Sequence, residues 1–137
     1  IKTLELRMER HCSNAQEVAA FLKQHPAVER VNFNGLPEHP DYELSRKQMR
    51  YPGSMLSFEL KDGLQAGINF MNRLQMCVRT VSLGTCDTLL SHPASMTHYS
   101  VPREQRLTYG ITDGLIRMST GIENVQDILA DLSNALS

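Results

Sequence analysis

The segment that decides the fold is residues 110–136, which read GITDGLIRMSTGIENVQDILADLSNAL. Leu115–Ser119 is a short, mostly apolar run, and its composition predicts a β-strand. In Asn124–Leu136 the apolar residues recur at intervals of three and four, which predicts an amphipathic helix with one face turned inward. A strand followed by such a helix favours a layered structure in which helices cover a sheet.

Strand-like and helix-like segments also alternate upstream of this unit. The patterns predict further strands at residues 28–33, 55–60 and 77–83, and helices at residues 4–25, 41–49, 62–74 and 103–107. Residues 84–102 are rich in turn formers and show no sustained period, so we expect a structured surface loop there. The predicted fold class is α/β, an α+β-like small domain whose sheet of about four strands, parallel or antiparallel, has helices packed on one face.

Length and composition are those of an ordinary globular domain. The 137 residues suit one domain, and 41% hydrophobic with 21% charged residues argues against disorder and coiled coils. The 14 basic and 15 acidic residues give a net charge of −1, so we expect neither nucleic acid nor a membrane as a partner. No apolar run reaches the roughly 20 residues of a membrane span, and no signal peptide is recognisable, which predicts a soluble cytoplasmic protein.

The cysteines and histidines form no recognisable ligand or disulfide pattern. His92 and His98 follow Asp87 in the expected loop, but their spacing is not that of a metal site. The sequence has no Gly-x-Ser-x-Gly elbow and no glycine-rich phosphate loop. We therefore predict no metal site and no catalytic nucleophile in this chain. The cysteines are Cys12, Cys77 and Cys86. We interpret them as reduced thiols, because their number is odd and no Cys-x-x-Cys pair occurs.

Arg117 is the most informative single residue, because it interrupts the apolar strand Leu115–Ser119. A guanidinium on a sheet face must either reach solvent or pair with a carboxylate or phosphate. Two interpretations follow from the residues alone: an outward-facing strand arginine, or the anchor of an anionic ligand.

Three separated segments carry a resemblance to a known family. They are Val81–Gly84 (VSLG), Ser91–His98 (SHPASMTH) and Gly110–Ser119 (GITDGLIRMS), and residues 4–12 (LELRMERHC) and 51–60 (YPGSMLSFEL) extend it over essentially the whole chain. In this order and spacing they resemble the C-terminal domain of the Cys/Met-metabolism family of pyridoxal-phosphate enzymes. The resemblance implies that residues 1–137 form the small C-terminal domain of a fold-type I enzyme.

The resemblance also implies roles for particular residues. In such enzymes the matching serine and arginine hold the substrate α-carboxylate, which assigns that role to Ser82 and Arg117. The planar fork of an arginine can pair with both carboxylate oxygens and so fix the orientation of an amino acid. The threonine of the Met-Thr-His segment lines the same pocket, which nominates Thr97. We interpret His92 and His98 as structural.

The residues that would bind pyridoxal 5'-phosphate are not recognisable in this chain. That cofactor needs a lysine, an acidic partner for its ring nitrogen and a phosphate cup. None of the lysines stands in the family's Ser-x-x-Lys setting; they are Lys2, Lys23, Lys47 and Lys61. The resemblance therefore implies a substrate-clamping domain that is inactive alone, with the cofactor and the catalytic residues on a large domain outside the chain. The start at Ile1, directly in helix-like sequence, also suggests a segment of a longer protein.

The implied activity of the complete protein is that of a carbon–sulfur lyase of sulfur amino acid metabolism. It would release a thiol, 2-oxobutanoate and ammonia by γ-elimination, and the family forms homotetramers. In members that act on cystathionine the position before the serine is acidic and can meet the substrate's distal ammonium. Val81 offers an apolar wall instead, which favours methionine, unless Val81 is simply a core residue of its strand.

Two alternatives remain open from the sequence. Within the family, the protein could act on cystathionine or on a homoserine ester. From a different class, a non-catalytic amino-acid-binding module could keep the Arg117 clamp without any reaction.

Overall fold

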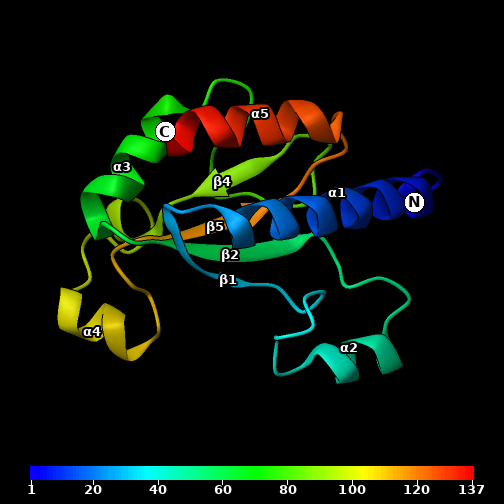
Figure 1. Ribbon diagram of the computed structural model, residues 1–137, viewed down its shortest axis with the longest axis horizontal. Helices are drawn as coiled ribbons and strands as arrows, with labels where there is room; N and C mark the ends of the chain where they lie inside the picture. Colours follow the sequence, from blue (N-terminus) through cyan, green and yellow to red (C-terminus); the bar gives the residue numbers. More distant parts are fainter.

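The computed structural model describes all 137 residues, which form one five-stranded sheet and five α-helices (Figure 1). In chain order the elements are α1 (Leu4–Gln24), β1 (Val28–Asn32), α2 (Tyr42–Gln48), β2 (Met55–Leu60), α3 (Gly63–Arg73), β3 (Val78–Arg79), β4 (Leu89–Ser91), the 3-10 turn η1 (Pro93–Ser95), α4 (Arg103–Thr108), β5 (Leu115–Ser119) and α5 (Val125–Leu136). The strand order is β1-β2-β5-β4-β3. All pairs are antiparallel except β3 with β4.

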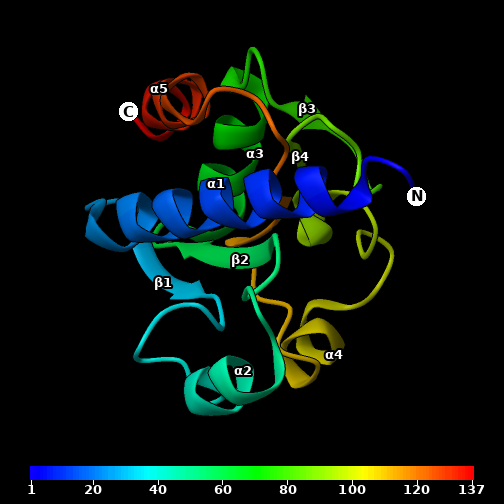
Figure 2. The same ribbon diagram turned by 90° about the vertical axis from the view of Figure 1, so that its right-hand side faces the viewer.

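Helices α1, α3 and α5 cover one face of the sheet, whereas α2 and α4 lie beyond the other face (Figures 1 and 2). Alternate residues of β2 and β5 point into the helix layer, and Phe58 and Ile116 are almost fully buried there. From α3, the Phe70 ring meets that of Phe58 edge-on, with centroids 5.6 Å apart. The predicted α/β class is confirmed, but the sheet has five strands rather than about four, and α2 and α4 do not lie on the predicted single helix-covered face.

The opposite face of the sheet carries the remaining side chains of the same strands. Arg117 of β5 lies directly across from Ser57 of β2 and from Ser91 of β4 in the antiparallel register. Directly opposed residues of an antiparallel pair share a face, so two small hydroxyl side chains flank the arginine. We call this the open face, because α1, α3 and α5 all lie on the other side.

The sheet differs from the prediction at its β4–β3 edge. A fifth strand, β4, lies inside the expected loop 84–102, where its three buried residues are too few to show a period. The strand expected at residues 77–83 is shortened to Val78–Arg79. Its pairing with β4 ends at Thr80, whose N–H donates to the Leu90 carbonyl, and the chain then bends away from the sheet.

No helix is both long and apolar enough to span a bilayer. The structure contains no cluster of three or more His, Cys, Asp or Glu side chains suited to a metal ion. The thiols of Cys12 and Cys77 are buried, that of Cys86 is exposed, and none is in a disulfide.

Candidate functional site: an arginine on the open sheet face

Arg117 stands in the middle of β5 with its side chain on the open face, partly exposed. It points there because its neighbours Ile116 and Met118 are fully buried in the helix-covered core, and strand residues alternate between faces. None of the chain's ion pairs involves Arg117. Its single hydrogen bond runs from Nη1 to the carbonyl oxygen of Val81, at 3.2 Å. The remaining N–H groups of the fork are therefore free to bind an anion.

The bond to Val81 ties Arg117 to the backbone that leads into Ser82. The accepting carbonyl belongs to the peptide unit that joins Val81 to Ser82, so the two sequence motifs meet in space although they lie 36 positions apart. Ser82 is exposed and its hydroxyl forms no hydrogen bond within the chain. A guanidinium and a hydroxyl are both donors that a carboxylate can accept from.

Val81 is not a core residue. Its side chain is 54% exposed, and it lies in a bend after β3 rather than in a strand. The interpretation of Val81 as a residue packed into the core is therefore wrong, because β3 ends at Arg79 and the chain leaves the sheet before Val81. The side chain instead presents an apolar surface beside the Arg117 contact.

Thr97 lies just beyond η1, which packs against β5. Its side chain is exposed, and Oγ1 is 2.8 Å from Nδ1 of the neighbouring His98. No hydrogen bond joins it to Arg117 or Ser82. The structure thus links Arg117 to the backbone that precedes Ser82, and it shows no hydrogen bond from Thr97 to either residue.

His92 is fully buried and both ring nitrogens are used within the fold. Nε2 is 2.7 Å from the carbonyl oxygen of Asp113, and Nδ1 is 2.8 Å from the hydroxyl of Ser95. Since a carbonyl can only accept, Nε2 carries the proton and Nδ1 accepts from the serine. Burial lowers the pKa of His92, and α3 passes so close that a Cβ at Gly67 would overlap the ring. These contacts agree with the structural interpretation of His92.

Sequence reasoning did not identify Ser57 and Ser91, which flank Arg117 on the open face. Their position depends on the register between three strands, one of which was not predicted. A short buried run such as Leu89–Ser91 gives no signal of its own, so only the pairing of β4 with β5 could have identified Ser91.

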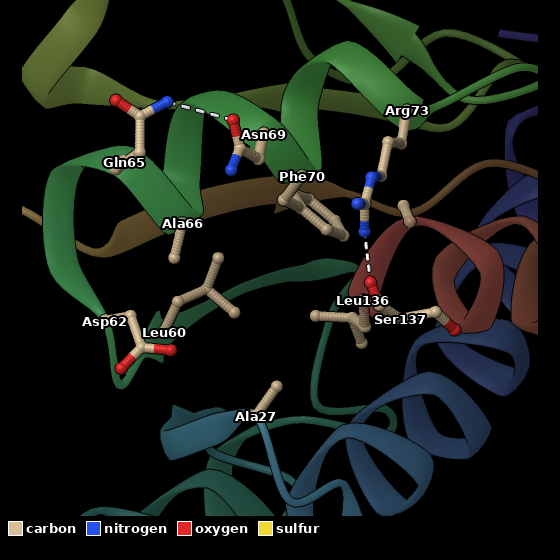
Figure 3. Close-up of a pocket in the computed structure, with 11 residues that line it drawn as sticks. Ala27, Leu60, Asp62, Gln65, Ala66, Asn69, Phe70, Arg73, Leu136 and Ser137 are labelled. Atoms are coloured by element: carbon tan, nitrogen blue, oxygen red, sulfur yellow. Dashed lines mark hydrogen bonds between the residues drawn. The ribbon is translucent and has the colours of Figure 1, made fainter.

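A separate cavity of about 310 Å³ lies on the helix-covered side of the molecule (Figure 3). It opens between α3, the end of α5 and the turn before β1, with Leu60 and Phe70 among its apolar lining residues. Its arginine, Arg73, already donates to the carbonyl oxygen of Ser137. None of the nominated site residues lines this cavity.

The lysines do not fit the requirements of a pyridoxal phosphate site. An imine-forming lysine needs a pocket that shields it from water. All four lysine side chains of this chain are exposed, and Lys23 is already paired with Glu38. We therefore derive no step of catalysis through that cofactor from the residues of this chain.

A model of the Cys/Met metabolism PLP-dependent enzyme family matches residues 1–137. The chain belongs to this family. It is 55% identical to the L-methionine gamma-lyase of Porphyromonas gingivalis, 48% to the cystathionine beta-lyase of Coxiella burnetii and 44% to the cystathionine gamma-lyase of Dictyostelium discoideum. Each alignment covers 99% of this chain but only 34–35% of the relative, so the chain spans about a third of their length. The resemblance drawn from the separated motifs is thereby confirmed.

Proposed function

We propose that the protein to which this chain belongs is a PLP-dependent carbon–sulfur lyase of the methionine gamma-lyase kind. The 137 residues would form its C-terminal substrate-clamping domain and supply the site for the substrate α-carboxylate. Identity supports this choice, since it falls from 55% with a methionine gamma-lyase to 44% with a cystathionine gamma-lyase. The structural observation that carries the proposal is the Arg117 side chain, which lacks a carboxylate partner and contacts the Val81–Ser82 peptide.

Arg117 and Ser82 would act by binding and orienting the substrate. The arginine fork can bind both carboxylate oxygens, and the serine hydroxyl can donate to one of them. The bond from Nη1 to the Val81 carbonyl holds the fork in one position before the substrate arrives, which reduces the entropy lost on binding. A carboxylate held at two points fixes the orientation of the Cα bonds of the amino acid.

The chemistry itself would come from outside this chain. Pyridoxal 5'-phosphate, when bound, supplies an electron sink for reactions at the α-carbon of amino acids. We propose that a large domain of the same protein holds it, together with the catalytic residues, in a cytoplasmic homotetramer. The overall reaction would be γ-elimination from methionine or a related thioether, giving a thiol, 2-oxobutanoate and ammonia.

Val81 and Thr97 would line the substrate pocket. The exposed apolar side chain of Val81 can accept a methylthio group with little loss of hydration, whereas a distal ammonium placed there would lose water without gaining a partner. This is the feature that favours methionine over cystathionine. Thr97 would lie at the margin of the pocket, since its hydroxyl bonds to His98.

The direct test is a substrate comparison with the complete, cofactor-loaded protein. We expect 2-oxobutanoate and methanethiol from L-methionine, with a higher kcat/KM than for L-cystathionine. A preference for cystathionine would place the protein with the cystathionine lyases of the same family. Binding of amino acids without any turnover would favour the non-catalytic module.

A further inference from the structure

The loop that carries Ser82 is fixed almost entirely by the segment that follows Arg117. Residues 81–87 are all exposed and belong to no helix or strand. Hydrogen bonds nevertheless join residues 81–88 to residues 117–123: Arg117 Nη1 to Val81 O (3.2 Å), Gly84 N to Ser119 Oγ (3.1 Å), Ile122 N to Cys86 O (2.8 Å), Gly121 N to Thr88 Oγ1 (2.9 Å), Thr88 Oγ1 to Glu123 Oε2 (2.9 Å) and Thr88 N to Glu123 Oε1 (2.5 Å).

Ser119 fixes the part of the loop nearest to Ser82. It lies two residues after Arg117 in β5, so its side chain is on the same open face, and it is 2% exposed. Its hydroxyl accepts the N–H of Gly84, which has a φ of +74°, a backbone conformation that favours glycine. The bond thus holds the turn two residues beyond Ser82.

Glu123 fixes the far end of the loop. Both of its carboxylate oxygens accept from Thr88, one from the backbone N–H and one from the hydroxyl. Glu123 forms no ion pair, so the hydrogen-bond partner of its carboxylate is Thr88 of the loop. The two segments are in such close contact that a Cβ at Gly121 would overlap the Cys86 carbonyl oxygen.

We propose that Ser119 and Glu123 are positioning residues, which hold the Val81–Thr88 loop so that Ser82 and Arg117 bind one carboxylate together. The inference rests on the proposed function, because it concerns the same ligand. A seven-residue exposed stretch without secondary structure has many conformations, and ordering it on binding would weaken the affinity. The two anchors restrict the loop in advance, Ser119 from the strand that carries the arginine and Glu123 from the segment between that strand and α5.

The test uses the complete, cofactor-loaded protein and two unreactive probes. L-norleucine carries an α-carboxylate and no leaving group, and n-pentylamine is the same molecule without the carboxylate. Dissociation constants are measured by equilibrium dialysis for Ser119→Ala and the nearly isosteric Glu123→Gln. The control is Thr85→Ala, because the Thr85 hydroxyl bonds only to Asp87 within the loop.

We expect each of the two variants to weaken norleucine about tenfold, the effect of losing one positioned hydrogen bond, with pentylamine affinity unchanged. The control should bind both probes as the parent does. Equal weakening of both probes would overturn the proposal, since a merely structural role does not distinguish them. The proposal would also be overturned if Ser119→Ala and Glu123→Gln bound norleucine as tightly as the control Thr85→Ala does.

A double variant separates action through Ser82 from any other route. If Ser119 works by placing Ser82, its substitution should change norleucine affinity by less than about twofold once Ser82 is already alanine. Additive losses would contradict the proposal. Arg117→Ala is measured in parallel to separate failure of the positioning role from failure of the proposed function. If Arg117→Ala lowers the affinity for norleucine and the Ser119 and Glu123 variants do not, only the positioning role fails. If Arg117→Ala leaves the affinity unchanged, the proposed carboxylate site fails.

Discussion

Replacing Arg117 by alanine in the complete protein should cost most of the catalytic efficiency. The change removes a partly buried arginine whose only hydrogen bond in the chain goes to the Val81 carbonyl oxygen, so its main role would be toward the ligand. Removing one partner of a desolvated, hydrogen-bonded charge pair typically costs about 2–5 kcal/mol. Converted at tenfold per about 1.4 kcal/mol, kcat/KM for methionine should fall by about 30-fold to several thousand-fold. Arg117→Lys should recover little, because lysine lacks the fork.

Arg30→Ala is the matched control for this experiment. Arg30 lies directly across from Glu59 in the β1–β2 register, and its guanidinium forms an ion pair with Glu59. Its loss should leave kcat/KM within about twofold of the parent, since Arg30 already has a carboxylate partner within the chain and forms no bond to Arg117 or to the Val81–Thr88 loop. The assay is initial-rate formation of 2-oxobutanoate by variants with parental circular dichroism and cofactor content. An Arg117→Ala protein no more impaired than Arg30→Ala would refute the carboxylate role and leave an ordinary strand arginine.

Three further outcomes are expected. The 137-residue chain alone should show no stoichiometric labelling of any one lysine by pyridoxal phosphate and borohydride, because all four lysines are exposed. One fully labelled lysine in mass spectrometry would contradict the proposal that the cofactor-binding lysine lies outside this chain. Val81→Glu, at a 54% exposed position, should fold normally and raise the kcat/KM ratio for cystathionine over methionine about tenfold, whereas an unchanged ratio would remove the basis for preferring methionine. Burial lowers the pKa of His92 below its ordinary 6.5, so His92 takes up a proton in the unfolded chain at a higher pH than in the folded one. The free energy of unfolding should therefore be highest above about pH 7 and decline as the pH falls through 6.5. His92→Gln should flatten that decline in thermal unfolding of the complete protein between about pH 7.5 and 5.5, and an unaltered slope would show that another group causes it.

The elements that could be predicted from sequence are those with a sustained period. The helix expected to end near residue 25 ends at Gln24, and the strands at Met55–Leu60 and Leu115–Ser119 have the predicted bounds. Each of these elements buries one face and exposes the other more, so apolar and polar residues recur along its sequence with the period of a helix or a strand. The three-residue strand β4 is buried on both faces, and no pattern marks it.

The candidate site residues could be nominated from the sequence, but their geometry could not. The apolar context of Arg117 made it conspicuous, and its orientation away from the core follows from alternation alone. Its contact with the Val81–Ser82 peptide depends on where β3 ends, which the sequence placed four residues too late, at 83 rather than 79. The Ser119 and Glu123 anchors are equally invisible in sequence, because each bonds to a backbone N–H of a loop about 35 positions away.

The central claim is that this chain binds the substrate α-carboxylate through Arg117 and Ser82. A crystal structure of the complete, cofactor-loaded protein with L-norleucine tests it most directly. We expect both carboxylate oxygens within about 3.2 Å of the Arg117 guanidinium, one of them also bonded to the Ser82 hydroxyl. A carboxylate bound to another cation, with Arg117 still contacting only the Val81 carbonyl, would contradict it.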